Sequence, residues 1–174
     1  MIQNERDTRH QRVMEAVGQM MTAARTAPKA KGIDIIEIAV VEGSDIQTLS
    51  DKTKELGIQK DYKFFLRDAE NILLSEAVLL IGTRRQEQAL NCGHCGFSAC
   101  NDKPEAVPCA INSIDVGIAI GSACAKASDL HLDTRVMFSA GYAAQYLDLL
   151  KNCSTVFAIP ISASSKNPFF DRKV

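Results

Sequence analysis

Four of the six cysteines lie in one short segment that also contains glycine. Residues 91–100 read Asn-Cys-Gly-His-Cys-Gly-Phe-Ser-Ala-Cys, and a further cysteine at position 109 completes the spacing C-x2-C-x4-C-x8-C. Four soft sulfur ligands on a short, flexible stretch of backbone are what a thiolate-bound metal centre needs. Gly93 and Gly96 favour such a centre, because glycine adopts backbone conformations that are closed to other residues. The predicted metal ligands are Cys92, Cys95, Cys100 and Cys109.

The fourth ligand is the least determined of the set. Cys109 follows Pro108 and would stand at the start of a predicted helix, where the positive end of the helix dipole stabilises a thiolate. Cys124 is the alternative if that helix folds back, although a cysteine among serine and alanine is more typical of a core position. Both residues are therefore candidates. His94 is predicted to be a loop residue beside the centre, because sulfur already completes the ligand set.

Two other chemistries match parts of the cysteine pattern. Four thiolates also bind zinc, and the first two spacings overlap those of a zinc knuckle, although a knuckle has histidine as its third ligand and a closer fourth ligand. The tetrapeptide at residues 92–95 matches the redox motif of disulfide isomerases, but neither a preceding tryptophan nor a strand-to-helix junction accompanies it. Iron–sulfur chemistry is therefore the leading interpretation, and zinc is the alternative metal.

Composition limits the classes of function. A chain of 174 residues with 46% hydrophobic residues predicts a single domain over residues 1–174, with the cysteine-rich metal-binding segment 91–109 inside it. The 20 basic and 21 acidic residues predict no nucleic-acid partner and no membrane partner. The polar N-terminus lacks the core of a secretory signal, and no stretch has the length of a membrane helix. We therefore expect a cytoplasmic protein whose cysteines are thiols or metal ligands.

The hydrophobic spacing predicts helices that alternate with buried strands. Helices are expected over residues 7–27, 45–57, 62–75, 109–130 and 140–150. Strands are expected over residues 33–41, 77–81, 135–138 and 155–161. Phe169 and Phe170 need an apolar contact, so the tail 162–172 is expected to be extended and to pack on another surface, such as that of a partner subunit.

Two segments resemble known families. Cys-Gly-His-Cys-Gly-Phe-Ser-Ala-Cys, residues 92–100, resembles the small 4Fe-4S domain of bacterial electron-transfer subunits, whose pattern opens Cys-Gly-x-Cys-Gly-x-x-x-Cys. The gap from Cys100 to Cys109 is shorter than in that domain. Residues 23–30, Ala-Ala-Arg-Thr-Ala-Pro-Lys-Ala, resemble a segment of nitroreductases, and the element order of the second half is similar. Together these features resemble the family of uncharacterised proteins that contain a ferredoxin domain.

The resemblance implies a fold and a set of partners. The implied fold is α+β, a nitroreductase-like sheet flanked by helices with a cysteine-rich iron–sulfur insert, and the implied assembly is a homodimer that holds flavin mononucleotide (FMN) at its interface. The flavin site implied by the resemblance is incomplete in this sequence. Lys29-Ala30-Lys31-Gly32 replaces the polar residues that follow the proline in nitroreductases and contact the flavin ring. The flavin-binding and catalytic residues are therefore unassigned. The cations that could contact a flavin phosphate are Lys29, Lys31, Lys166 and Arg172.

Two hypotheses of function follow. The first is a redox protein that holds a 4Fe-4S cluster through four cysteines and transfers electrons, with a redox partner protein or with a flavin that reduces a small substrate. If the protein is an enzyme, it would be an oxidoreductase of nitroreductase-like type. The second hypothesis is a non-enzymatic dimeric module with a structural zinc site that binds a partner protein.

Overall fold

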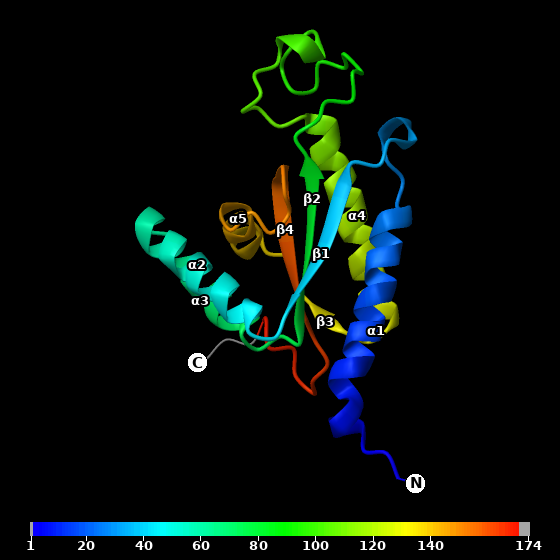
Figure 1. Cartoon of the computed structure of the whole chain (residues 1–174), viewed down its shortest axis with the longest axis vertical. Coiled ribbons are helices and arrows are strands. Elements are labelled where there is room, and N and C mark those ends of the chain that lie inside the picture. The colour runs from blue at the N-terminus through cyan, green and yellow to red at the C-terminus, as the bar shows by residue number, and fades with distance from the viewer. Residues whose placement is uncertain (1, 171–174) are drawn as a thin grey trace.

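The computed structural model describes residues 2–170, and its centre is a four-stranded antiparallel sheet in the order β1-β2-β4-β3 (Figure 1). β2 pairs with β1 from Ile36 opposite Thr83, and with β4 from Ala77 opposite Ile161. β2 is buried along seven of its eight residues, as expected of a continuous apolar run in the middle of a sheet. The strands are β1 (Ile36–Glu42), β2 (Ala77–Arg84), β3 (Asp133–Thr134) and β4 (Cys153–Ser162).

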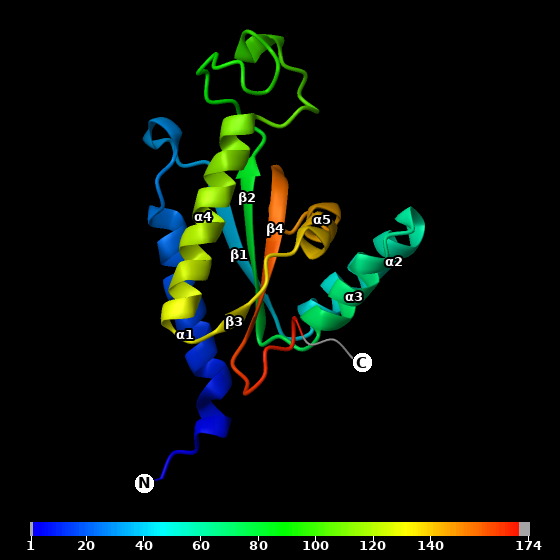
Figure 2. The same ribbon diagram turned by 180° about the vertical axis from the view of Figure 1, so that it is seen from behind.

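Helices cover both faces of the sheet. On one face α1 and α4 lie side by side and enclose a core with Met20, Ala24 and Ala123 (Figures 1 and 2). On the other face α2, α3 and α5 enclose a second core around Phe65 and Leu80. The helices are α1 (Glu5–Thr26), α2 (Asp45–Lys60), α3 (Lys63–Ile72), α4 (Ala110–Asp129) and α5 (Phe138–Tyr146), with short 3-10 turns η1 (Ala30–Gly32) and η2 (Cys100–Asp102). These layers confirm the α+β fold class.

Several predicted element boundaries differ from the structure: the first strand begins at Ile36, the third helix ends at Ile72 and the last helix ends at Tyr146. Two further differences have a clear physical reason. The second helix does not end at Gly57 but continues to Lys60, because Asp61 adopts the left-handed conformation that closes it. Gly57 instead lies where α2 packs against α3, and a Cβ added there would lie 2.8 Å from the Phe65 Cβ. The third strand lies at Asp133–Thr134 and not at residues 135–138, since Phe138 already begins α5 and only Met137 forms an isolated bridge to β4.

The C-terminal tail packs on its own chain up to residue 170. Phe169 is 1% exposed and belongs to the core beneath α2, α3 and α5, and its carbonyl accepts a 2.6 Å hydrogen bond from the Arg135 guanidinium. Phe170 is 60% exposed, and the Arg135 guanidinium carbon lies 4.8 Å from the centroid of its ring. The expected apolar contact is therefore confirmed for Phe169, and its own chain supplies it without a partner subunit. Arg172 lies outside the described residues.

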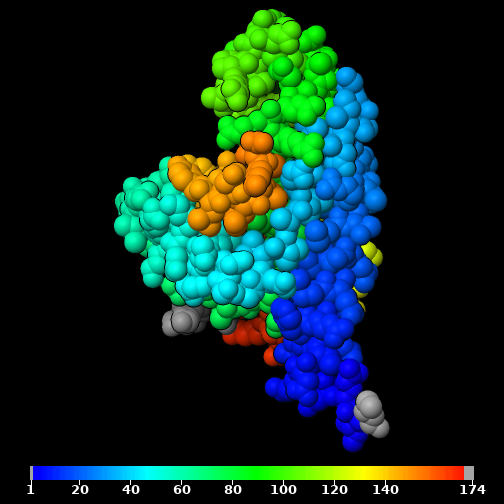
Figure 3. All heavy atoms as spheres, in the orientation of Figure 1, coloured from blue at the N-terminus to red at the C-terminus, as the bar shows by residue number. Residues whose placement is uncertain are grey.

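The cysteine segment, here residues 85–109, stands apart from the two cores. Figure 1 shows it at the C-terminal end of β2, beyond the sheet, before the chain turns back into α4. In the space-filling view it forms a separate lobe at one end of the molecule (Figure 3). No helix within residues 2–170 has both the length and the apolar character that a membrane-spanning helix requires.

Candidate metal centre

Two hydrogen bonds join Asn91 and Cys100, the residues at the ends of the first cysteine loop. The Asn91 backbone N–H donates to the Cys100 sulfur at 3.3 Å, and the Cys100 backbone N–H donates to the Asn91 side-chain oxygen at 2.8 Å. Asn91 has a φ of 47°, a left-handed conformation that asparagine tolerates better than most residues. The pair closes a loop of residues 91–100 that carries three of the four predicted ligands. An amide N–H directed at a ligand sulfur is one of the contacts that tune iron–sulfur centres.

A tight turn over residues 93–96 follows Cys92 and contains Cys95. The Gly96 N–H donates to the Gly93 carbonyl at 2.9 Å, and both glycines have positive φ, 90° and 73°. The glycines therefore supply the backbone freedom that the sequence predicted for them. The His94 ring lies 3.1 Å from the Cys92 carbonyl oxygen, so it is engaged with the loop backbone. Cys92 is exposed and Cys95 is partly exposed, which leaves both sulfurs accessible to a metal.

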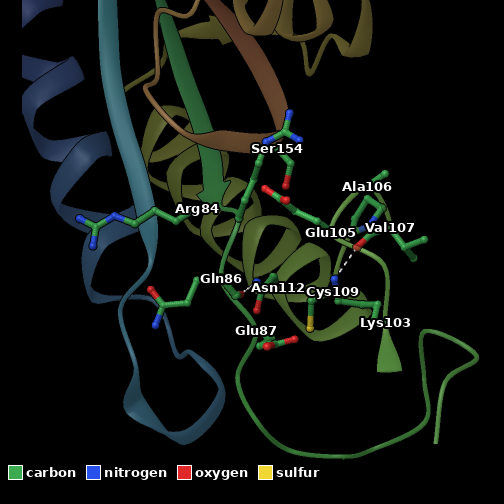
Figure 4. Close-up of a pocket in the computed structure, with 12 residues that line it drawn as sticks. Arg84, Gln86, Glu87, Lys103, Glu105, Ala106, Val107, Cys109, Asn112 and Ser154 are labelled. Atoms are coloured by element: carbon green, nitrogen blue, oxygen red, sulfur yellow. Dashed lines mark hydrogen bonds between the residues drawn. The ribbon is translucent and has the colours of Figure 1, made fainter. Parts of the chain in front are cut away.

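Cys109 caps the start of α4. Its carbonyl accepts hydrogen bonds from the backbone and the hydroxyl of Ser113, at 3.1 and 3.2 Å, and its side chain is partly exposed. In Figure 4 the Cys109 sulfur points away from the helix toward the loop of the cysteine segment. The unpaired N–H groups of a helix start stabilise negative charge, so this position suits a thiolate ligand.

The remaining two cysteines lie elsewhere. Cys124 is 15 residues further along α4, about 22 Å away at the rise of an α-helix, and burial raises the pKa of its thiol. Cys153 is buried in β4, where burial raises the pKa of its thiol to about 11. Both groups are therefore held as neutral thiols. The geometry favours Cys109 over Cys124 as the fourth ligand.

The four thiols are close in the chain but are not gathered into a finished site. Within residues 2–170, no three His, Cys, Asp or Glu side chains lie close enough together to hold a metal ion. The donor set fits a thiolate-bound centre, and the segment that carries it lies outside both cores. Metal binding would therefore have to close the segment around the ion or cluster, a coupling that is common in small metal-binding segments.

Beneath the segment lies a buried polar patch that the sequence reasoning missed. Asn112 and Asp115 face it from the first turns of α4, and Gln88 reaches it from the segment. The Asn112 amide N–H donates to the Gln86 carbonyl at 2.6 Å, and Asp115 accepts the Ala30 N–H at 3.2 Å with each carboxylate oxygen. The amide oxygens of Gln88 and Asn112 have no donor within the described residues. A buried acceptor without a donor costs about 1–3 kcal/mol, so these two oxygens lower the stability of the patch.

The Asp115 carboxyl makes the stability of the patch depend on pH. Burial raises its pKa above the ordinary value of 3.8, although the Ala30 N–H and the nearby Lys29 charge oppose the shift. A raised pKa in the folded state favours folding below the ordinary value, and this contribution is lost as the pH rises through the folded pKa. We expect the free energy of unfolding of the metal-free protein, measured by urea titration, to fall relative to Asp115→Asn as the pH rises from about 4 to 7. Parallel pH profiles would contradict this assignment.

A cavity of about 370 Å³ opens beside Cys109. The end of β2, the chain from Lys103 to Cys109 and Asn112 of α4 form its walls (Figure 4). The Lys103 ammonium donates to the Val107 carbonyl at 2.7 Å, and this bond closes the turn that forms one wall. The cavity has a volume typical of small-molecule sites.

Sequence comparison identifies relatives. The profile of a family described as "Uncharacterized protein containing a ferredoxin domain" matches residues 105–172, a range that includes Cys109 but not the first three predicted ligands. An uncharacterized protein of the archaeon Archaeoglobus fulgidus is 39% identical over 182 residues, which cover 99% of this chain and 98% of the relative. The chain belongs to this ferredoxin-domain family. The archaeal relative matches 99% of this chain, so the similarity between the two proteins extends over nearly their whole lengths.

Solved structures with the same fold include nitroreductases. A nitroreductase with bound FMN from Bacteroides fragilis superimposes with a TM-score of 0.63 over 92% of this chain and 82% of its own, at 11% identity. A nitroreductase family protein from Clostridium novyi gives a TM-score of 0.61 over 90% of this chain and 76% of its own, at 17% identity. These identities show the fold alone. The ferredoxin-domain family member therefore has a nitroreductase-like fold, which confirms the expected scaffold.

Proposed function

We propose that the protein is a redox protein that binds a 4Fe-4S cluster through Cys92, Cys95, Cys100 and Cys109 and transfers single electrons. The observation that carries the proposal is the placement of four thiols on one segment outside both cores, three of them in a loop closed by the contact between Asn91 and Cys100. The family description supports iron–sulfur chemistry. When bound, the cluster would supply the one-electron chemistry. If the protein is an enzyme, it is an oxidoreductase.

The residues of this chain would set the properties of the cluster. The Asn91 N–H would place positive charge beside the Cys100 sulfur, and the start of α4 would do the same at Cys109. Hydrogen bonds and partial positive charge stabilise the reduced, more negative state of a cluster and raise its reduction potential. The exposed position of Cys92 leaves one side of the segment accessible to a redox partner protein.

Colour tests the metal directly. Protein prepared without oxygen should be brown, with a broad absorbance near about 400 nm that bleaches when dithionite adds an electron. Colourless protein with one zinc ion per chain would support the second hypothesis, in which a structural metal orders the segment and the dimer binds a partner protein. In that case, removing the metal would disorder residues 85–109 without abolishing any turnover.

The proposal includes a homodimer formed through the exposed face of α4. Ile114 and Ile118 are 51% and 41% exposed on this face, and an added Cβ at Gly117 or Gly121 would meet no atom within 4 Å. Nothing in the described chain packs on these two glycines, so the close helix packing that their spacing indicates would need a second copy. We expect Ile118→Asp to convert a dimer to a monomer in light scattering, because a carboxylate would be buried at the helix contact without a partner.

A matched control separates the dimer face from general effects of the substitution. Ile58 is 68% exposed on α2, on the other face of the sheet, so Ile58→Asp should leave the molar mass unchanged. A monomeric wild-type chain at micromolar concentration, or an Ile118→Asp variant that stays dimeric, would count against the α4 interface.

The flavin part of the expectation finds no complete site in the single chain. The Lys29 ammonium donates to the carbonyls of residues 24, 25 and 27 at the end of α1, and Lys31 donates to the Gln88 carbonyl at 3.1 Å. The Lys29 ammonium is thus fully committed to the chain's own backbone, and Lys31 is held against the cysteine segment. Neither lysine is placed as a phosphate ligand by these contacts, and we derive no step through a flavin.

A further inference from the structure

We propose that Asp115 takes up a proton when the cluster held by the cysteines gains an electron, so that electron transfer by this protein is coupled to proton uptake. The inference rests on the proposed function, because it needs a redox centre at Cys109. In the proposed step, one electron arrives from the redox partner protein and one proton arrives from solvent. The Asp115 carboxylate becomes a neutral carboxylic acid, so the net charge of the protein does not change.

Asp115 is buried close to the predicted ligand Cys109. It is 3% exposed and lies six residues beyond Cys109, about 9 Å along α4 at the rise of an α-helix. The Ala30 N–H of η1 lies 3.2 Å from both carboxylate oxygens and donates to them. Because α4 and η1 both lie outside the cysteine segment, this contact does not depend on how residues 85–109 close around a metal.

The charges around Asp115 leave its carboxylate without an ion pair in the described part of the chain. Lys29 acts on it from the end of α1, but the Lys29 ammonium donates to three carbonyls there and lies beside the pair of Arg25 and Asp34. Lys31 of η1 donates to a carbonyl of the cysteine segment. Residues 110–125 contain no other charged side chain. Burial outweighs the Lys29 charge and raises the pKa of the Asp115 carboxyl, which brings its protonation closer to neutral pH.

A proton on Asp115 would also supply a donor where the surroundings lack one. The Gln88 amide nitrogen lies 3.5 Å from one Asp115 oxygen, and the amide oxygen is buried without a donor in the described residues. Half a turn of the amide would exchange this long contact for a hydrogen bond from the protonated carboxyl to the amide oxygen. The second carboxyl oxygen would still accept the Ala30 N–H. The neutral form of Asp115 therefore fits its surroundings.

The separation of the two groups sets the size of the coupling. At about 9 Å and an effective dielectric constant of about 20, one added electron raises the proton affinity of a carboxylate about tenfold. The coupling is reciprocal, so the proton on Asp115 raises the affinity of the centre for an electron by the same factor, which is about 59 mV for one electron. Deprotonated Asp115 repels the incoming electron. The reduction potential should therefore fall as the pH rises through the pKa range of Asp115 and stay constant on either side.

Spectroelectrochemical titration of the full-length protein, purified without oxygen, tests this between about pH 4.5 and 8. We expect the wild-type potential to fall by about 59 mV in total. Asp115→Asn should keep the acid-end value of the wild type at every pH, because asparagine is neutral and retains an acceptor for the Ala30 N–H. Asp129→Asn changes an exposed carboxylate paired with Lys126 at the far end of α4 and should retain the wild-type dependence. A wild-type potential independent of pH, or an unchanged dependence in Asp115→Asn, would overturn the proposal.

Infrared difference spectroscopy identifies the group that takes up the proton. The spectrum of the reduced minus the oxidised protein should gain the C=O band of a protonated carboxylic acid, and Asp115→Asn should lack this band. The same band in the asparagine variant would assign the proton to another carboxyl and refute the role of Asp115. Protein without iron would overturn this inference together with the proposed function, whereas brown protein with a pH-independent potential would overturn the inference alone.

Discussion

Replacing Cys95 with serine is expected to remove most of the iron and sulfide from the protein, whereas the same change at Cys153 should leave both in place. Cys95 lies in the closed loop of residues 91–100, within the turn from Gly93 to Gly96. A serine hydroxyl does not ionise near neutral pH and is a harder ligand than sulfur, so the cluster would lose one of its four anchors. Cys153 is buried in β4 with a thiol pKa of about 11, and its sulfur remains a neutral part of the core.

The same assay decides the fourth ligand. Cys109→Ser should lose the metal, and Cys124→Ser should keep it, since Cys124 lies far along α4 from the segment. Circular dichroism on all four variants separates metal loss from unfolding. Equal metal content in the Cys95 and Cys153 variants would refute the ligand assignment.

Gly141→Ala is expected to be the most destabilising single-methyl change in the fold. Gly141 lies in α5 where the helix crosses β4, and an added Cβ would overlap the Val156 carbonyl oxygen and lie 2.5 Å from the Phe157 Cα. These atoms belong to the backbone of a paired strand, so the clash is relieved only by moving the helix away from the sheet. We expect the free energy of unfolding to fall by about 3 kcal/mol or more and the melting temperature by about 6–12 °C.

Gly18→Ala is the matched control for that change. Gly18 lies on the exposed side of α1 with open space around it, so alanine there should raise stability by about 0.5–1 kcal/mol. Thermal unfolding followed by circular dichroism measures both variants. A melting temperature for Gly141→Ala within about 2 °C of wild type would show that α5 and β4 are not packed as described.

Elements with strong local signals were predictable from the sequence. The apolar run at residues 77–81 lies in a strand, and the repeating apolar residues of the first helix form its buried face with Val13, Val17 and Met20. The cysteine spacing identified the segment, and its glycines have the positive φ that the pattern required. These features depend on residues close together in the chain.

Features that depend on contacts between distant residues were not predictable. Gly57 looks like the end of a helix, but it lies opposite Phe65 in the next helix, and only the packing of α2 on α3 shows why glycine is needed there. Phe169 looks like an interface residue because its core is built from helices far away in the sequence. Asn112 lies in a predicted helix, and only the structure shows that its side chain is buried there and donates to the Gln86 carbonyl.

Part of this information was nevertheless present in the sequence. Asn91 stands immediately before Cys92, and asparagine tolerates the left-handed conformation that a loop closure needs. Asn112 and Asp115 are spaced by three residues, so they share one face of a helix that otherwise buries small apolar side chains. Polar residues at helical spacing on a buried face indicate a site or a network, and they would have pointed to the patch beneath the segment.

Iron and sulfide analysis of protein prepared without oxygen tests whether the four cysteines hold an iron–sulfur cluster. We expect about four iron atoms and four sulfides per chain, the content of one 4Fe-4S cluster. Both contents should fall together in the Cys95→Ser variant. About one zinc ion per chain, with no acid-labile sulfide, would contradict the cluster and favour a structural metal site.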